Sequence, residues 1–533
     1  MSKEHKKISR RSILKGAAIL GTLQLIPGFV RRAAAQAAEA KAFVMGVPSS
    51  ADGLSTIVAQ SDYVGRLIER SLLDYDRKGG TFTLVPGTAK EMPEILDDGL
   101  RFRFKLREDA FYHDGSPVNA QSIAAWVDMQ INPDNPNNKL YTWRSLGRVT
   151  NIEKITVVDD HTIDFKLKKF NAAQLDWFTD PGFSGSPTAI LQATPDLTTK
   201  EAAAGPFMVR RHVRGETTVL QRFDKFFDKE EGVAPNIGLR PIPELNSRIA
   251  ALEAGEIDWM DGLSAEAANR LKGNDRIVVA EQKTLNVWFV SMDMRKKPFD
   301  DLRVRQAMNY AVDKDALIRD VLGGGAERSY SPLSPQYGDF YAGDEVQHYD
   351  YNPDKARQLL EEAGLKGGFK TTLFTNTGRA GQMKPVEMST FLQANWKAVG
   401  IDCDIQAIEW GAFEERRRKG EFPLATRGWT PASGDPDSVL SQNFLGSMVP
   451  PVQRNVAYLQ DKEVDDFLNA GMATMDGSER AKAFRAAQKR IVDLAPWVFV
   501  CHEIAYEAYS VNLKGYKPHP AGRGIGLTRA YKV

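Results

Sequence analysis

The stretch FKTTLFTNTGRAGQMKPVEMSTFLQANWKAVGIDCDIQAIEW, from Phe369 to Trp410, joins three segments of different pattern. Residues 369–375 form a short run of β-branched and aromatic side chains, which predicts a strand. Residues 387–401 repeat apolar side chains at helical spacing, and residues 402–410 form a second β-like run. A strand, a helix and a strand in this order predict a partly parallel sheet flanked by helices, so we expect an α/β fold.

Helix-terminal residues surround this unit in the second half of the chain. In YNPDKARQLLEEAGL, Asn352 can cap a helix, Pro353 fits the first helical position, and Gly364 can end the helix. In LNSRIAALEAGEID, the expected N-cap is Asn246. The run DLRVRQAMNYAVDKDALIRDVLGGG also repeats apolar residues at helical spacing and predicts a helix.

The first half of the chain shows strand patterns instead. Alternation in RFRFKLRE places Phe102, Phe104 and Leu106 on one face of a half-buried strand. The run ITVVDDHTIDFKLKK predicts a hairpin with Asp159 and Asp160 in the turn. Since no low-complexity linker separates the two halves, we expect the chain to cross between lobes within ordinary strands.

Length and composition limit the class of protein. A chain of 533 residues exceeds the size at which single cores stop growing, so two or more lobes are expected. The net charge is +1 and no basic stripe with interleaved aromatic residues is present, so nucleic acid is not an expected partner. Cys403 and Cys501 lie in β-like runs, which favours two unpaired buried thiols, with one disulfide bridge as the alternative.

The N-terminal segment predicts export. Residues 9–15 read SRRSILK, a weakly apolar stretch follows at 16–30, and small residues follow at 33–35. This order is typical of a twin-arginine signal peptide cleaved near Ala35 or Ala37, and it predicts a periplasmic protein. The alternatives are an uncleaved membrane anchor or a chance pair of arginines.

Catalytic motifs are missing from the sequence. The seven histidines are scattered without zinc spacing, and there is no G-x-S-x-G elbow, phosphate-binding loop or dinucleotide fingerprint. In FYHDGSP, His113 and Asp114 resemble a site, but Asp-Gly and the following Pro117 favour a turn. We therefore expect a protein that is not an enzyme and that binds no cofactor and no metal.

Stretches distributed in order over nearly all of the mature chain resemble the extracytoplasmic solute-binding proteins of ABC importers, family 5, the peptide, opine and nickel class. They include DDGLRFRFKLREDAFYHDGSPVNAQSI, KKPFDDLRVRQAMNYAVDKDALI and KEVDDFLNAGMATMDGSERAKAFRAAQKRIVDLAPWVF. The resemblance implies a two-lobed α/β periplasmic binding protein of type II, cluster C-like, with mixed sheets flanked by helices and a ligand cleft between the lobes. The implied division is a signal peptide at 1–35, a discontinuous lobe I at 36–285 and 500–533, and lobe II at 286–499.

The resemblance also implies a function. The expected role is the substrate-binding component of an ABC importer, which closes on a peptide-like or amino-acid-conjugate solute of the dipeptide, glutathione or opine class. Its expected partners are the permease and ATPase subunits, and the expected state is a monomer. One alternative is a ligand sensor that presents its closed form to a chemoreceptor or signalling partner. A secreted hydrolase is a further alternative, which the lack of a nucleophile–base pair disfavours.

Site residues are carried over position by position. Arg379 falls where relatives hold a ligand carboxylate, and the alternative is a solvated loop arginine. In GWTPASGDPDSV, Trp429 matches an aromatic residue that packs on ligand, and a core tryptophan is the alternative. Ala432 occupies the position of the aspartate that binds the ammonium of dipeptides, which argues against a plain dipeptide. Four further residues complete the expected ligand-binding set: Ser433, Asp435, Tyr141 and Asp52, although Asp435 and Asp437 alternatively only shape the turn.

Overall fold

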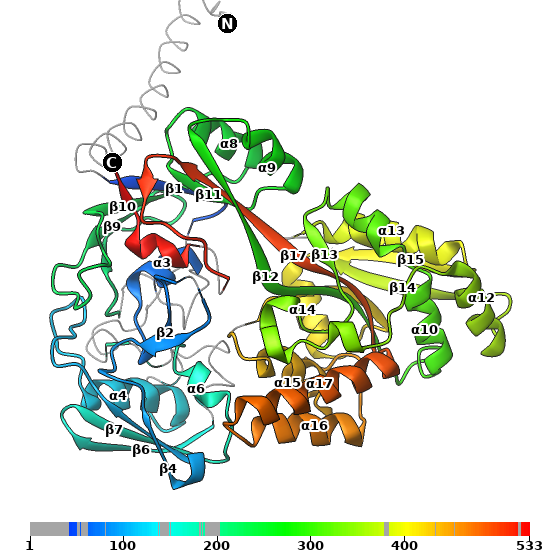
Figure 1. Ribbon diagram of the computed structural model, residues 1–533, viewed down its shortest axis with the longest axis horizontal. Coiled ribbons are helices and arrows are strands. Elements are labelled where there is room, and N and C mark those ends of the chain that lie inside the picture. Colours follow the sequence, from blue (N-terminus) through cyan, green and yellow to red (C-terminus); the bar gives the residue numbers. More distant parts are fainter. Residues whose placement is uncertain are drawn as a thin grey trace, which may run out of the picture.

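Two groups of strands and helices lie side by side, joined by the long strands β12 (Ile277–Met292) and β17 (Trp497–Ser510) (Figure 1). We call the described residues before β12 and after β17 lobe I, and those between the two strands lobe II. The structure, a computed structural model, describes residues 42–50, 54, 62–79, 81–136, 138, 149, 151–180, 183, 185–186, 203–377, 383–431, 433–451, 454–520 and 524–533.

One large sheet extends through both lobes. Its strands follow the order β15 (Ile401–Ile408), β14 (Phe369–Asn376), β16 (Leu424–Trp429), β12, β17, β11 (Trp259–Asp261), β1 (Phe43–Val47), β10 (Asn236–Pro241), β9 (Thr218–Arg222) and β8 (Phe207–Arg211), with β13 (Ala326–Arg328) also paired to β17. The register of β12 on β17 shifts between Lys283 and Val287, opposite the step from Ile504 to His502. The hydrogen-bond ladder between the two connecting strands is therefore interrupted at this point of their length.

The predicted βαβ unit is confirmed in lobe II. Strands β14 and β15 pair in parallel, α13 connects them, and β16 is also parallel to β14. The helices of lobe II are α10 (Leu302–Tyr310), α11 (Lys314–Ala316), α12 (Pro353–Glu362), α13 (Pro385–Lys397), α14 (Trp410–Arg418), α15 (Asp437–Phe444), α16 (Lys462–Met472) and α17 (Gly477–Leu494).

Alternation along β12 separates two cores of lobe II. Trp288 and Val290 belong to a core with residues of α10, α12 and α13. Val287 and Phe289 belong to a second core with residues of α15, α16 and α17. Because successive strand side chains point to opposite faces, helices cover both faces of this part of the sheet.

Lobe I repeats this layering around β1. Phe43 and Met45 pack with residues of α3 (Asp62–Ile68), while Val44 packs toward α8 (Leu245–Glu253) and α9 (Ala265–Leu271). The chain ends with the short pair β18 (Leu513–Lys514) and β19 (Tyr531–Lys532).

A second, smaller sheet completes lobe I. Its order is β4 (Glu94–Leu96), β5 (Arg101–Lys105), β7 (Thr162–Leu167) and β6 (Ile152–Asp159), covered by α4 (Ala120–Ile131), with α6 (Gln174–Trp177) and the pair β2 (Leu73–Tyr75) and β3 (Leu84–Pro86) nearby (Figure 1). Phe102 and Phe104 are fully buried, as the alternation in β5 predicts. The predicted β6–β7 hairpin is confirmed.

Helix ends test the capping predictions. Asn352 accepts a hydrogen bond from the backbone of Lys355, so that cap is confirmed. The prediction for Asn246 is wrong: α8 begins at Leu245, because Arg248 donates to the carbonyls before the helix and fixes the entry of the chain there.

Two other predictions concern the long helical run and the cysteines. The run after residue 301 is not one helix: α10 ends at Tyr310, and Asp313 caps a new segment by accepting from the backbone of Ala316. Cys403 and Cys501 are buried free thiols, as the β-like runs favour, and burial raises the pKa of each.

Candidate ligand-binding site

The carboxyl ends of the parallel strands β14, β15 and β16 meet at one edge of the sheet. The backbone N–H of Thr377, just after β14, donates to the carbonyl of Ile408 at the end of β15 at 2.9 Å. Residues 430–431 and 433–436, between the end of β16 and α15, leave from the same edge. Ligands of open α/β sheets bind beyond the carboxyl ends of such strands, so this edge is the candidate site.

The loop after β16 is held by its own hydrogen bonds. The indole N–H of Trp429 donates to the carbonyl of Ser438 at 2.9 Å. The hydroxyl of Ser438 in turn donates to the carbonyls of Ser433 at 3.1 Å and Asp435 at 2.7 Å. The loop is therefore a fixed turn that leads directly into α15.

The two acids of the loop have different environments. Asp435 accepts from the backbone N–H of Asp437 at 2.9 Å through Oδ1 and pairs with Arg480 at 2.6 Å through Oδ2. Asp437 is buried, which raises its pKa to about 6, and the neighbouring Asp435 carboxylate adds to the rise. Both oxygens of Asp435 are engaged within lobe II, which supports the interpretation that it shapes the turn; contact with ligand stays a prediction.

The loop also contacts lobe I. The backbone N–H of Gly434 donates to the Tyr75 hydroxyl at 2.9 Å, and that hydroxyl donates to Asp176 Oδ1 at 2.5 Å. Burial, followed by the Asp176 carboxylate, holds the pKa of Tyr75 well above its usual value, so the phenol keeps its proton. The Tyr75 hydroxyl therefore links a lobe II backbone group to a lobe I carboxylate.

Aromatic rings pack around this link. Phe82 of lobe I lies against Gly434 so closely that a Cβ there would be 2.5 Å from Phe82 Cδ1. The Phe82 ring centroid is 5.4 Å from that of Tyr75 and 6.0 Å from that of His519. We call Tyr75, Phe82, His519 and Gly434 the interlobe cluster. The candidate edge therefore faces lobe I directly.

Trp429 has a mixed environment. Its side chain belongs to a lobe II core and is 9% exposed, in keeping with the core alternative. The guanidinium of Arg454 lies over its ring, 4.6 Å from the centroid. The predicted packing of Trp429 on ligand stays a proposal.

Arginines beside Trp429 were missed by the sequence analysis. Arg427 lies two residues earlier on β16, and Glu414 pairs with Arg417 at 3.1 Å and with Arg454 at 3.6 Å. We call Glu414, Arg417, Arg427 and Arg454 the arginine cluster. The available signal was an arginine inside the otherwise buried run LATRGW, but its partners lie too far along the chain to be recognised.

Four predicted site residues, Arg379, Ala432, Tyr141 and Asp52, lie outside the described residues. Ser433 is described, is buried, and accepts a 3.3 Å hydrogen bond from the backbone of Asp435 through its hydroxyl. The predicted turn at His113 and Asp114 is confirmed, since Asp114 accepts from the backbone and hydroxyl of Ser116.

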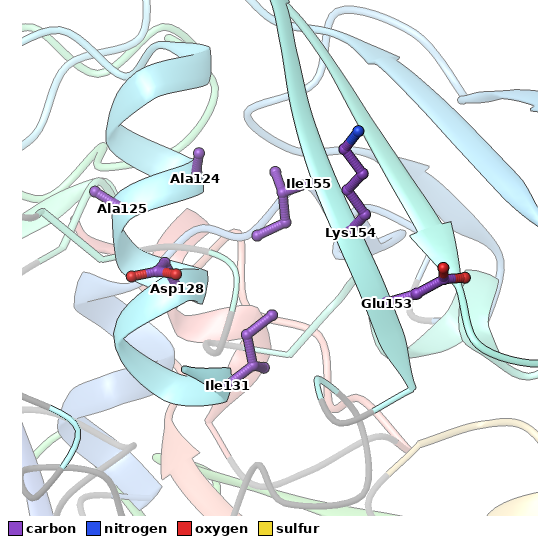
Figure 2. A pocket seen from close by; sticks show the side chains of 7 residues that line it. All are labelled: Ala124, Ala125, Asp128, Ile131, Glu153, Lys154 and Ile155. Atoms are coloured by element: carbon purple, nitrogen blue, oxygen red, sulfur yellow. The ribbon is translucent and has the colours of Figure 1, made fainter. Parts of the chain in front are cut away.

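A surface pocket lies elsewhere, on the small sheet of lobe I. Figure 2 shows its walls: Ala124, Ala125, Asp128 and Ile131 of α4 face Glu153, Lys154 and Ile155 of β6. None of these residues comes from the candidate edge or from lobe II, so the pocket is not part of the candidate site.

The described residues contain neither an arrangement of side chains for a metal ion nor a membrane-spanning helix. No group of three or more histidine, cysteine, aspartate or glutamate side chains in that part of the chain is arranged to hold a metal ion. No helix within it has the length and apolar character needed to cross a membrane.

Comparison with known proteins defines the class. The family model for bacterial extracellular solute-binding proteins, family 5 (middle), matches residues 83–449, and the chain belongs to this family. It is 28% identical over 529 residues to the dipeptide-binding protein of Escherichia coli K12, covering 94% of this chain and 97% of that protein. It is 30% identical over 478 residues to a glutathione-binding protein of Pectobacterium atrosepticum, covering 88% of each.

Solved structures agree on the fold. An ABC transporter-associated periplasmic binding protein from Helicobacter pylori in complex with the peptide STSA superimposes with a TM-score of 0.79 at 24% identity, covering 93% of this chain and 99% of that one. The fold is the two-lobed α/β fold of type II periplasmic binding proteins. Family 5 proteins are extracytoplasmic solute-binding components of ABC importers that take peptides or similar ligands, and these relatives are binding proteins rather than enzymes.

Proposed function

We propose that this chain is the periplasmic substrate-binding component of an ABC importer for a peptide-like or amino-acid-conjugate solute. The observation that carries the proposal is the contact between the lobe II loop and lobe I, through Gly434 and Tyr75, at the carboxyl edge of β14 and β16. A solute held at this edge touches both lobes, so it favours the closed arrangement in proportion to the contacts it gains there.

The hinge of this closure is proposed at the irregular level of β12 and β17. The register shift between Lys283 and Val287 interrupts the ladder where the chain leaves lobe I. With the lobes divided near 285 and 500, each large buried cluster falls within one lobe, apart from Leu285, Val500 and Cys501 at the division itself. A pair of strands whose hydrogen-bond ladder is interrupted bends at a lower cost in free energy than a pair with a continuous ladder.

Arg379 is the proposed anchor for a ligand carboxylate. It follows Asn376, the last residue of β14, by three positions, a span of at most about 11 Å. A guanidinium at this edge offers a bidentate fork to a carboxylate. Ala432 removes the amine anchor that dipeptide-binding relatives carry, so glutathione, an opine or another conjugate is favoured over a plain dipeptide.

The proposal also covers the export of the protein and its docking on the importer. The sequence SRRSILK near the N-terminus directs export by the twin-arginine route, and the mature protein acts as a monomer. It presents the closed form to permease and ATPase subunits.

Calorimetry tests the proposal on ligand-free protein with glutathione, an opine and simple dipeptides. Arg379→Ala should weaken binding of the solute by about 30- to several-thousand-fold, because a stranded carboxylate costs about 2–5 kcal/mol. Arg379→Lys should recover part of the loss. Ala432→Asp should improve dipeptide binding. Indifference of every solute to Arg379→Ala would remove the carboxylate anchor, and tight binding of dipeptides by the wild type would show that another acid holds the amine.

A further inference from the structure

Arg427 is a deeply buried cation with an unused donor. Its side chain lies on β16 opposite Phe289, with the guanidinium carbon 5.6 Å from that ring, and the residue is 3% exposed. Among the described residues, Nη1 of Arg427 has no hydrogen-bond partner. Burying a charged donor without a partner is costly, so the position calls for an explanation.

The neighbours of Arg427 increase this cost. Three guanidinium groups, those of Arg417, Arg427 and Arg454, lie near the carboxylate of Glu414, so these four described side chains together carry a formal charge of +2. Burial lowers the pKa of Arg427 to about 9, and the Arg417 guanidinium acts in the same direction. Burial likewise lowers the pKa of Arg454 to about 10. An anion beside the cluster would offset both penalties.

A buried arginine with a purely structural role looks different in this molecule. Arg305 is equally buried, at 3% exposure, but it donates to the carbonyls of Leu494 at 2.9 Å, Phe299 at 2.8 Å and Asp300 at 3.2 Å. Arg305 thus ties a loop and two helix ends together. Arg427 makes no comparable set of contacts among the described residues.

The cluster lies beside the candidate site. Arg427 and Trp429 share one face of β16, because residues two apart on a strand point the same way. Thr426 points to the opposite face, where its hydroxyl lies 2.8 Å from that of Ser389 on α13. Arg454 covers the Trp429 ring, and the loop that begins after Trp429 reaches Tyr75 of lobe I.

We propose that Arg427 and Arg454 form a second anion subsite, which takes an acidic group of the solute separate from the carboxylate assigned to Arg379. The inference rests on the proposed function and deepens it: the solute is a peptide-like compound with at least two acidic groups. Arg454 lies over the Trp429 ring, and Phe82 of the interlobe cluster packs against the same buried cluster that contains Trp429. Glu414 pairs with Arg417 and Arg454, and Nη1 of Arg427 is the donor assigned to the acidic group of the solute.

The selectivity test compares acids with their matched amides by calorimetry on ligand-free protein. The probes are glutathione and its analogue with the α-carboxylate of the γ-glutamyl residue converted to an amide, and Ala-Glu and Ala-Gln, so that both members of each pair keep the C-terminal carboxylate. The wild type should prefer the acid of a pair by about 30-fold or more, and Arg427→Met should reduce that preference to about twofold. Arg416→Met is the matched control, since Arg416 lies on α14 but pairs with exposed Glu421. It should leave the preference intact. Arg379→Ala should instead weaken acid and amide together.

A thermal measurement separates this role from a structural one. Because burial and the neighbouring guanidinium groups outweigh the Glu414 carboxylate at Arg427, Arg427→Met should raise the midpoint of unfolding of ligand-free protein by about 2 °C or more. It should also reduce the rise that an acidic probe produces. A lower midpoint without ligand would make Arg427 structural and overturn the subsite.

Four other outcomes would also overturn it. Acid and amide could bind the wild type equally, the preference could survive Arg427→Met, or the wild type could bind neither pair. The last outcome concerns the thermal stabilisation of the protein by inorganic phosphate. If phosphate alone gave the full Arg427-dependent stabilisation and no acid preference existed, the site would hold a free anion rather than the solute. Loss of binding in Arg379→Ala together with an unchanged acid preference in Arg427→Met would reject the subsite and keep the proposed function.

Discussion

The backbone N–H of Gly434 donates to the hydroxyl of Tyr75 at 2.9 Å, and this bond joins the loop after β16 in lobe II to β2 in lobe I. The loop is held in place within lobe II. The Ser438 hydroxyl donates to the carbonyl of Asp435, and the Asp435 carboxylate pairs with Arg480. The loop residues that meet lobe I are therefore held by hydrogen bonds and an ion pair within lobe II.

Tyr75→Phe should weaken solute binding by about 2- to 12-fold. The change removes one interlobe hydrogen bond worth about 0.5–1.5 kcal/mol in the closed form and leaves the ring packing intact. Calorimetry with the solute measures the loss. Tyr112→Phe is the control, because the Tyr112 hydroxyl bonds Ser122 within lobe I. Equal losses in both variants would show that the Tyr75 bond stabilises a lobe rather than closure.

Gly434→Ala should oppose closure more strongly, by about 1–3 kcal/mol, because its Cβ would meet the Phe82 ring at 2.5 Å. Small-angle scattering should then show a radius of gyration near the open value at solute concentrations that close the wild type. Gly367→Ala is the control, since nothing lies within 4 Å of a Cβ there. Normal closure of the Gly434 variant would mean that Phe82 moves aside freely.

Lowering the pH should reduce the free energy of unfolding, in part because the buried imidazole of His519 must take up a proton. Burial lowers the pKa of His519 to about 4 from an ordinary 6.5, and Arg77 acts in the same direction. The unfolded chain therefore binds more protons between these values, so this contribution is complete above about pH 6.5 and is lost as the pH falls toward 4. His519→Gln should remove about 2 kcal/mol of the pH dependence measured by urea unfolding at pH 5 and 7.5.

Other groups also titrate between pH 5 and 7.5, so the pH dependence of unfolding must be compared between His519→Gln and the wild type. Asp437 titrates in the opposite sense, because its raised pKa, about 6, makes its contribution disappear as the pH rises through that value. His502, whose pKa burial also lowers to about 4, keeps part of the acid sensitivity in the variant. Identical slopes for variant and wild type would mean that His519 titrates normally.

Replacing both Arg10 and Arg11 by lysine should retain the precursor in the cytoplasm. The twin-arginine pair is read by a receptor and does not act as an anchor, so a charge-conserving change is sufficient. Cell fractionation and immunoblotting of a producing strain measure the distribution. Delivery of the double variant to the periplasm at the wild-type level would contradict this export route.

Local signals predicted much of the fold. Asn352, Pro353 and Gly364 mark the ends of α12 because capping and left-handed backbone depend on neighbouring residues alone. The alternation in β5 and the order β14–α13–β15 had the same local origin. Asn246 failed as a cap, because Arg248 folds back onto the carbonyls before α8, a contact that no periodicity expresses.

The site was less accessible to sequence reasoning. Trp429 and Asp435 were found through the resemblance, but the pairing of Asp435 with Arg480 joins residues 45 positions apart. The arginine cluster gathers its members from α14, β16 and the segment before α16, and the Tyr75 contact crosses between lobes. Such groupings depend on tertiary packing, so a single sequence carries no local trace of them.

The central claim is that an acidic, peptide-like solute is held between the lobes by Arg379. Mass spectrometry of the small molecules released by denaturing the purified mature protein tests it most directly, with the Arg379→Ala variant prepared in parallel. The account predicts close to one equivalent of a peptide-like carboxylate from the wild type and little or none from the variant. Release of a solute without a carboxylate, or of the same solute in equal amount from both proteins, would contradict it.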